Sequence, residues 1–144
     1  MVDPTIQREN DGTFHITVGN SVHKGCQQEW SPALGRWTTV FKTPAPGPVI
    51  KTQYLHSDVE ITEGKVLEMI HSSGKIPGVV RVGWYGSVKR DNGLDVECPS
   101  KDGRHRKVCL ELMDEGDPFM GIETPYEALI VIWDLLEGGT FLHL

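Results

Sequence analysis

Residues 49–70 read VIKTQYLHSDVEITEGKVLEMI, and this stretch decides the fold class. Its first part, Val49–Leu55, is rich in β-branched and aromatic residues, which is typical of a strand. The segment Ser57–Glu60 then has the form of a capping box, in which a serine and a glutamate satisfy free N–H groups at the start of a helix. Gly74 marks the stop, so the sequence predicts a helix from about Asp58 to Ser73.

Glu63 stands out within this helix because its carboxylate falls on the apolar stripe. On a 3.6-residue period it shares a face with residues that should meet a sheet. A buried charge needs a partner, and the nearest candidate is Lys51 in the preceding strand. The alternative is a rotated helix, in which Glu63 is a solvated neighbour of Lys65. The residues that share the stripe are Val59, Val66, Leu67 and Ile70.

The segments around residues 49–70 read as further strands of one antiparallel sheet. Gly35–Thr43 leads through the rigid turn Pro44–Pro48 into the next strand, which predicts a hairpin. Two more strands follow the helix, with the long polar loop Lys89–Arg106 between them. This order predicts an α+β fold. The other expected elements are strands at Phe14–Val18, Val79–Val88 and Lys107–Met113, a polar irregular stretch from Asn20 to Ser31, and a helix from Tyr126 to about Glu137.

The chain divides into three parts by this pattern. We expect an N-terminal extension (1–31), a domain of strands and one helix (32–113), and a hinge with a final helix (114–144). The final helix is apolar all round, and such a helix is normally buried on every side. The sequence therefore favours a neighbouring segment that is missing from these residues, and the alternative is that residues 1–31 cover the helix.

Charge and composition disfavour several classes of protein. The 144 residues contain 14 Lys and Arg against 20 Asp and Glu, which gives a net charge of −6. Phosphate contacts need clustered basic residues, so this balance disfavours a nucleic-acid or anionic-membrane partner. No apolar run approaches the roughly 20 residues of a membrane span, and the N-terminal residues lack the pattern of a secretory signal. We expect an intracellular protein, cytoplasmic or nuclear.

Three cysteines at wide spacings predict reduced thiols rather than a disulfide framework. A zinc site built from Cys98, His105 and Cys109 is an alternative, but these spacings match no common zinc pattern and lack a fourth ligand. The basic stretch Lys101–Lys107 is interpreted as a solvated hairpin tip. The alternative for this stretch is a nuclear-localisation or nucleic-acid patch.

A series of segments between residues 33 and 144 resembles the parts of one known family, in the same order. Val49-Ile-Lys51 looks like the strand Val-Ala-Ile-Lys, and Glu63–Ile70 looks like the helix that supplies the partner of that lysine. Residues 108–116 resemble a strand that ends at a hinge, and residues 126–143 the long helix after it. The phrases Gly-Arg-x-Thr-Thr-Val-Phe-Lys, Met-Asp-Glu-Gly-x-Pro-Phe and Ile-Glu-Thr-Pro-Tyr-Glu-Ala-Leu are similar to the fungal-type protein kinase family.

The resemblance implies a kinase-like small lobe, in which an antiparallel sheet carries one packed helix, followed by a hinge and the first helix of a large lobe. A complete relative transfers the γ-phosphate of ATP, bound with Mg²⁺, to a protein serine or threonine. By this resemblance Lys51 contacts the α- and β-phosphates, and Glu63 orients it. Gly35 belongs to the residual phosphate loop, and the backbone of Met113 and Glu115 faces adenine.

Two departures from the family pattern limit what these residues are expected to do. Trp37 stands where a phosphate loop carries its second glycine, and the sequence contains neither the His-Arg-Asp loop nor the Asp-Phe-Gly magnesium ligand. We therefore expect a fragment or degenerate copy that is inactive alone and holds nucleotide weakly or not at all. The alternative is a non-enzymatic interaction module that presents the helix Tyr126–Leu136 to a protein partner.

Overall fold

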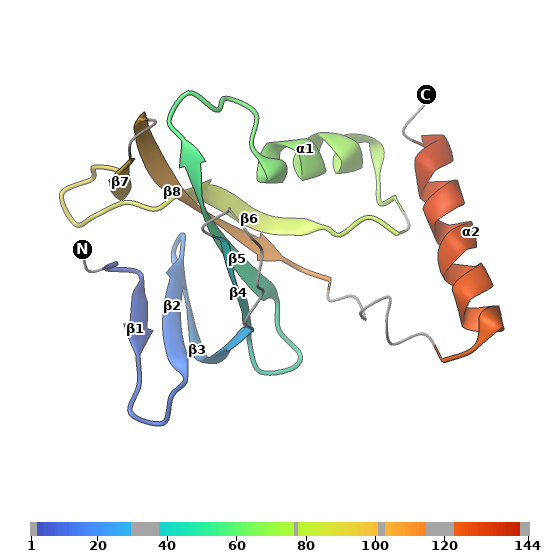
Figure 1. Ribbon diagram of the computed structural model, residues 1–144, viewed down its shortest axis with the longest axis horizontal. Helices are drawn as coiled ribbons and strands as arrows, with labels where there is room; N and C mark the ends of the chain where they lie inside the picture. Colours follow the sequence, from blue (N-terminus) through green and yellow to red (C-terminus); the bar gives the residue numbers. More distant parts are fainter. Residues whose placement is uncertain (1–2, 30–37, 77, 101–102, 115–122, 142–144) are drawn as a thin grey trace.

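The computed structural model has an α+β architecture, as predicted, in which two helices accompany one curled antiparallel sheet (Figure 1). It describes residues 3–29, 38–76, 78–100, 103–114 and 123–141. The strands are β1 (Ile6–Arg8), β2 (Phe14–Val18), β3 (Ser21–Glu29), β4 (Thr38–Lys42), β5 (Val49–His56), β6 (Val82–Ser87), β7 (Glu97–Ser100) and β8 (Gly103–Leu112). The helices are α1 (Glu63–Ile70), which continues into the short 3₁₀ helix η1 (His71–Ser73), and α2 (Pro125–Phe141).

Strand β5 lies near the centre of the sheet. The strands follow the order β1-β2-β3-β4-β5-β8-β6, and β7 pairs with the remaining length of β8. The predicted hairpin is confirmed, because β4 pairs with β5 and sets Val40 opposite Lys51. The sheet curls so far that β2 contacts β8. Strands β1–β3 therefore form an N-terminal ribbon that folds back over one face of the sheet (Figure 1).

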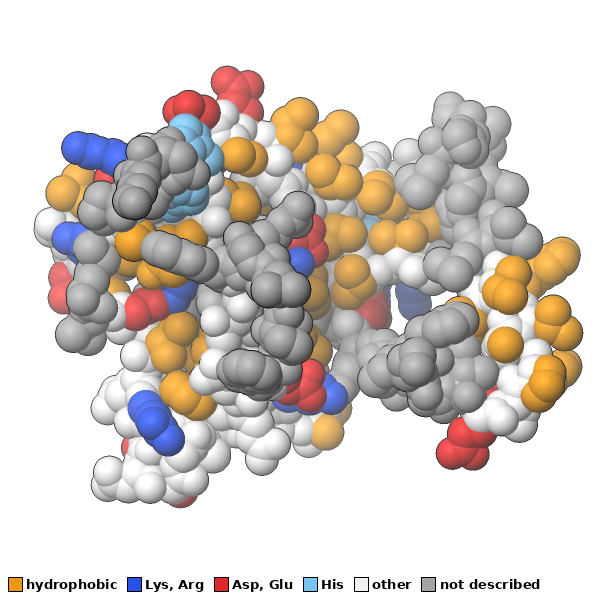
Figure 2. Space-filling model, in the orientation of Figure 1, with side chains coloured by type: hydrophobic (Ala, Val, Ile, Leu, Met, Phe, Trp, Pro, Cys, Tyr) orange, Lys and Arg blue, Asp and Glu red, His pale blue; other side chains and the backbone are white. Residues whose placement is uncertain are grey.

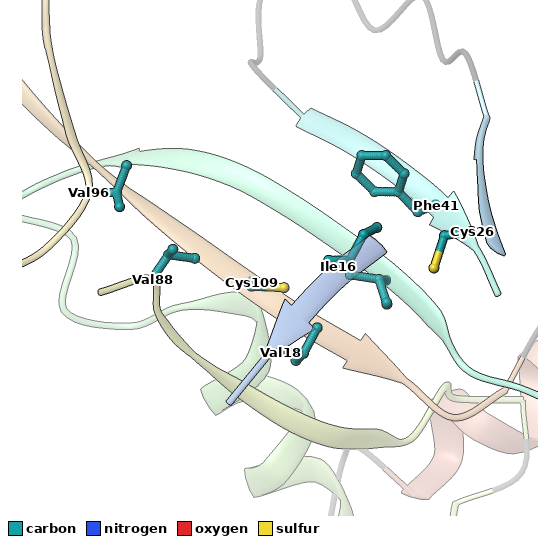
Figure 3. Close-up of a cluster of buried hydrophobic side chains, with 8 residues drawn as sticks. Ile16, Val18, Cys26, Phe41, Val88, Val96 and Cys109 are labelled. Atoms are coloured by element: carbon teal, nitrogen blue, oxygen red, sulfur yellow. The ribbon is translucent and has the colours of Figure 1, made fainter. Parts of the chain in front are cut away.

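Apolar side chains of the N-terminal ribbon build the core together with the sheet. Ile16, Val18 and Cys26 come from the ribbon, and Figure 3 shows them in one cluster with Phe41 and Cys109. The other buried members are Ile50, Val88 and Val96. The ribbon thus buries one face of the sheet. In Figure 1 the ribbon lies at the opposite end of the molecule from α2. The alternative in which these residues cover the final helix is wrong for the part of them that the structure describes.

The prediction of an irregular stretch after Asn20 is also wrong, because residues 21–29 form β3. Cys26 is the one buried side chain of this fully described strand. A strand that exposes polar residues on both faces lacks the alternation by which strands are recognised in a sequence. β3 therefore forms because β2 and β4 pair with it, and not because of its own pattern.

The predicted loop from Lys89 to Arg106 contains further pairing. Lys89 forms an isolated bridge with Asp95, and β7 pairs with the start of β8. Cys98 lies opposite His105 in that pairing, whereas Cys109 lies four residues further along β8, about 13 Å away at roughly 3.4 Å per residue. The three candidate zinc ligands therefore do not meet. Within the described ranges, no group of three or more side chains is placed to bind a metal.

The basic stretch begins at the tip of the β7–β8 hairpin, as predicted, where the Arg104 side chain is 77% exposed, and it continues into β8. The Arg104 guanidinium lies 3.4 Å from a carboxylate of β7, and Arg106 donates a hydrogen bond to the carbonyl of Val59. Lys107 is only 2% exposed. Lys101 lies outside the described residues. The described basic side chains are thus engaged within this domain.

α1 begins later than the sequence predicts. The hydroxyl of Thr62 accepts a hydrogen bond from the N–H of Lys65 at 3.4 Å and caps the helix, which starts at the next residue. Ser57, the predicted cap, instead donates its hydroxyl to the carbonyl of Arg104 at 2.8 Å. The predicted capping box does not form because its serine is bonded to the neighbouring strand. The strand predicted at Phe14–Val18 has these ends as β2, the other predicted elements are present with shifted ends, and β1 and β7 are additions to them.

Lys107 is the largest fully buried side chain in the described part of the chain. Its ammonium contacts the carboxylate of Asp3, which also accepts hydrogen bonds from the N–H and the hydroxyl of Thr5 at 3.0 and 2.7 Å. Burial lowers the pKa of Lys107 to about 8. A buried ammonium that loses its partner costs several kcal/mol. Asp3 therefore ties the start of the N-terminal ribbon to β8.

We predict that Asp3→Asn lowers the free energy of unfolding by about 1 kcal/mol at pH 7, because Lys107 loses its partner and then gives up its proton, which its folded pKa of about 8 allows at a cost of about one pKa unit. This deficit should shrink as the pH rises above 8. Above pH 8 folded Lys107 is neutral in the parent as well as in the variant, so Asp3 no longer has a charge to pair with. Both proteins gain stability with pH there, because the unfolded chain still binds the proton. Urea unfolding of both proteins at pH 7 and at about pH 10 measures the change.

Asp11→Asn is the matched control for this experiment. Asp11 accepts the same two hydrogen bonds from Thr13, at 2.9 and 2.7 Å, but it is exposed and Thr13 is its partner. This variant should therefore cost less, and its cost should not change with pH in the same range. An Asp3→Asn deficit that is equal at the two pH values would contradict the buried ion pair.

Candidate functional site

The Lys51 ammonium and the Glu63 carboxylate meet between the sheet and α1. Nζ of Lys51 donates a hydrogen bond to Oε2 of Glu63, with 2.6 Å between the two atoms. Lys51 lies within β5, and Glu63 is the first residue of α1. The predicted pairing is confirmed. The alternative in which Glu63 is a solvated neighbour of Lys65 is wrong, because Lys65 bonds Glu68 instead.

The pair is partly exposed, whereas the sequence predicts that it is buried. The Lys51 and Glu63 side chains are 25% and 38% exposed. Solvent screens charges at such a position, so we expect the pair to contribute about 1 kcal/mol or less to stability, and not the several kcal/mol that a buried pair would lose with one partner. The same exposure leaves the ammonium accessible to a ligand.

The register of the sheet decides which way Lys51 faces. It lies opposite Val40 of β4 and Leu110 of β8, and residues that face each other across strands share one face. Successive side chains of a strand point to opposite faces, so the neighbouring Ile50 faces the other way, into the core under the N-terminal ribbon. One face of β5 therefore carries the core and the other carries the ion pair.

Tyr85 of β6 determines how closely α1 packs on the sheet. A Cβ atom at Gly64 would lie 2.3 Å from the Tyr85 ring, so only a glycine fits there. The Tyr85 hydroxyl donates to Oε2 of Glu68 at 2.8 Å, and the Lys65 ammonium donates to the same oxygen at 2.9 Å. Together Lys65 and then Tyr85 hold the pKa of Glu68 below its ordinary value. These contacts hold the first turn of α1 in place on the sheet, and with it Glu63, which bonds Lys51.

His71 anchors the other end of the helix. Its Nδ1 accepts the N–H of Ile76 at 3.2 Å, which leaves Nε2 to carry the proton. Nε2 then donates to the carbonyl of Val80 at 3.1 Å. The imidazole therefore joins the end of α1 to the segment that enters β6. Sequence reasoning missed both His71 and Tyr85. A glycine in the first turn of a helix was the available signal for close packing.

The residues predicted to face adenine are only partly placed by the structure. The N–H of Met113 donates to the carbonyl of Arg81 at 2.9 Å, so this donor is engaged within the protein. Of the Met113 backbone groups predicted to face adenine, only the carbonyl is left as a candidate. Gly35 and Glu115 lie outside the described residues, and their predicted roles stay predictions.

Arg81 also bonds Asp114, the residue that follows Met113. Its Nε lies 2.9 Å from Oδ2 of Asp114, its terminal nitrogen reaches Oδ1, and its backbone N–H donates to Oδ2 at 2.8 Å. These bonds lower the pKa of Asp114 to about 2. The end of β8 is therefore fastened to the start of β6, on the side of the sheet from which the chain continues toward α2.

The site has to be interpreted from its own geometry. No protein-family model, curated protein or solved structure matches this chain. Neither described helix combines the length and the apolarity needed to cross a bilayer.

We predict that Gly64→Ala lowers the free energy of unfolding by about 2 kcal/mol, although alanine favours helices, because the new methyl group overlaps the Tyr85 ring and pushes α1 outward. Urea unfolding measures the loss. Lys65→Ala, at the exposed next residue, is the control and should cost less than half as much. In a Gly64→Ala/Tyr85→Ala double variant the overlap is gone, so the two losses should not add. Additive losses would show that α1 does not rest on the ring.

We further predict that the carboxyl group of Asp114 titrates at about pH 2 and that Arg81→Ala returns its pKa toward 3.8. Because the folded pKa lies below the unfolded value, the pair stabilises the protein above about pH 4, and this contribution is lost as the pH falls toward 2. Carboxyl ¹³C NMR follows the titration. Lys75→Ala, which removes a weaker and more remote charge, should shift the pKa less. A titration unchanged by Arg81→Ala would contradict the pair.

Proposed function

We propose that these residues form the nucleotide-binding small lobe of a kinase-like protein, similar to the fungal-type protein kinases, in which Lys51 binds the α- and β-phosphates of ATP. The observation that carries this proposal is the 2.6 Å hydrogen bond between Lys51 on β5 and Glu63 on the helix that follows. Protein kinases hold ATP with a strand lysine that is paired in this way with a helix glutamate. The complete protein would transfer the γ-phosphate to a protein serine or threonine.

The order of the elements supports the same function. After α1 the chain forms β6, the short β7 and then β8, and β6 and β8 are the two long strands, of which β8 returns to pair with β5 before it ends near Met113. This succession of strand, helix, two strands and hinge matches the order in which the resembling segments occur along the sequence. In such an arrangement the adenine would lie near the end of β8, and the phosphates would extend toward Lys51.

Glu63 gives the lysine a fixed position before any ligand binds. A charge that is already oriented binds a phosphate oxygen without a further loss of side-chain freedom. The partial exposure of Lys51 leaves its remaining N–H groups for that oxygen. The described residues hold no cluster of magnesium ligands. This part of the chain therefore contributes the lysine contact to the phosphates.

Binding by these residues is expected to be weak. The N–H of Met113 is already bonded to Arg81, which removes one donor for adenine. A tryptophan replaces a glycine of the phosphate loop, so the backbone closes less readily over phosphates. We expect a Kd for ATP in the millimolar range.

The test is a titration of the 144-residue chain with ATP, with and without Mg²⁺, followed by the backbone amide resonances of β5. ATP should shift the resonances around Lys51, and Lys51→Met should abolish these shifts because the ammonium that meets the phosphates is gone. Glu63→Gln should weaken binding without abolishing it, since the lysine then loses its fixed position.

Lys65→Met is the matched control, because Lys65 is also a lysine paired with a glutamate, but it is more exposed and bonds Glu68 and not Glu63. It should leave the ATP response unchanged. Shifts that persist in Lys51→Met, or ATP that shifts no resonance of β5 at millimolar concentration, would contradict the proposed function.

A second candidate function is a protein-interaction module, and the surface of α2 favours it. Tyr126, Leu129 and Trp133 are 72%, 65% and 64% exposed. Figure 2 shows apolar side chains gathered on this helix. Adjacent exposed apolar side chains are typical of surfaces that bind other proteins. In this case Leu129→Glu should reduce the fluorescence of an apolar-surface dye such as ANS without lowering the melting temperature, and an unchanged signal would count against it.

A further inference from the structure

A pocket of about 610 Å³ lies on the face of the sheet that Lys51 does not occupy. Cys109 and Glu111 of β8 line it, and they alternate with Leu110, the residue opposite Lys51. Its other wall is the turn end of the β2–β3 hairpin, residues 17–21. The pocket thus sits in the seam between the N-terminal ribbon and β6, where the curled sheet does not close. The open mouths of curled sheets are common places for ligand sites.

The lining of this seam pocket is rich in hydroxyl and amide groups. Thr17, Asn20 and Ser21 line it from the turn, and Thr5 and Ser87 line it from the two adjoining segments. Each of these side chains both donates and accepts hydrogen bonds. An apolar ligand would leave such groups without partners, at a cost in free energy. The lining therefore favours a ligand that carries several hydroxyl groups of its own.

The two charged side chains in the lining already face partners of this chain. Nζ of Lys89 lies 2.6 Å from Oδ1 of Asp95, and Oε1 of Glu111 lies 3.3 Å from Nε2 of His23. Lys89 is thus neutralised, and His23 carries a charge only when it is protonated, so the lining offers no free positive charge and favours an uncharged ligand over a phosphate or a carboxylate. Nε2 of His23 is buried and makes no hydrogen bond to the described residues. A ligand hydroxyl beside Glu111 would also lie near Nε2 of His23, whose hydrogen bonds are incomplete.

Trp84 supplies the aromatic part of the pocket, whose other apolar lining residues are Val18, Val88 and Cys109. A Cβ atom at Gly19 would lie 2.8 Å from the indole nitrogen, and one at Gly86 would lie 2.9 Å from the ring. Gly19 also has φ 56°, a conformation that suits glycine. Both glycines therefore let the indole lie close against the turn and the strand. An aromatic ring beside several polar groups suits a ligand with one apolar face and a rim of hydroxyls.

We propose that the seam pocket binds an uncharged ring that carries several hydroxyl groups, as a monosaccharide or the ribose of a nucleoside does. Its volume lies within the range of about 300–1,000 Å³ that is typical of small-molecule sites. Glu111 accepts hydrogen bonds from ring hydroxyls, Asn20 bonds the ligand from the turn, and Trp84 packs against the ring. This site is independent of the Lys51–Glu63 pair and of the proposed function.

The test is an NMR titration of the 144-residue chain with D-glucose, N-acetyl-D-glucosamine and adenosine. The indole N–H of Trp84 and the amides of residues 17–21 should shift progressively, with a Kd in the millimolar range. Glu111→Gln keeps the shape of the side chain but weakens it as an acceptor, so binding should weaken about tenfold. A response to the sugars identifies a saccharide site, and a response to adenosine alone identifies a nucleoside site.

Glu68→Gln is the matched control and should leave the affinity unchanged, because Glu68 lies on α1. Asn20→Ala changes an exposed turn residue, so it tests the pocket even where Glu111→Gln disturbs the fold. No shift with any of the three ligands would overturn the proposal, as would full affinity in Asn20→Ala and in a folded Glu111→Gln. Adenosine binding that is lost in Lys51→Met would place the nucleoside at Lys51 and would also overturn it.

Discussion

The hydrogen-bonded pair of Lys51 and Glu63 is the interaction on which the position of α1 and the interpretation of the site depend. It joins a central strand to the first residue of a helix of 8 residues, which is too short to be stable in isolation. The Tyr85 ring under Gly64 sets how closely the helix packs, and His71 holds its far end. Because the helix is held at its start, its flank and its end, Glu63 stays beside the lysine.

Two lysines on neighbouring strands differ in burial and in the partner that holds them. Lys51 is partly exposed and its carboxylate partner lies on a helix, so a ligand can compete for it. Lys107 is almost completely buried and contacts Asp3, which holds the N-terminal ribbon against the sheet. The face of β8 that carries Lys107 is closed by the ribbon, and the seam pocket remains where that closure is incomplete. One face of the sheet thus carries the partly exposed ion pair, and the other carries the buried lysine and the seam pocket.

The ion pair could be predicted from the sequence because it follows from local periodicities. Alternation along a strand and the 3.6-residue period of a helix place Lys51 and Glu63 on facing surfaces with no knowledge of the rest of the chain. The hairpin of β4 and β5 was predictable for the same reason. The pair's exposure was not, because it depends on how much of the surrounding surface other segments cover.

The features that the sequence did not reveal arise from partners distant along the chain. β3 carries mostly polar residues and is a strand because two other strands pair with it. Ser57 has the pattern of a helix cap, but the carbonyl of Arg104 engages its hydroxyl. The N–H of Met113 is engaged by Arg81 in the same way. Local patterns therefore predicted the lysine pair but not the engagement of the Met113 N–H at the end of β8.

A double-mutant cycle on the Lys51–Glu63 pair tests this organisation most directly. The free energies of unfolding of the parent chain, Lys51→Met, Glu63→Gln and the double variant are measured in urea at neutral pH, at low and at high salt. A partly exposed pair at 2.6 Å predicts a coupling energy of about 0.5–1 kcal/mol that decreases at high salt. Losses that simply add at both salt concentrations would mean that no such pair joins α1 to the sheet.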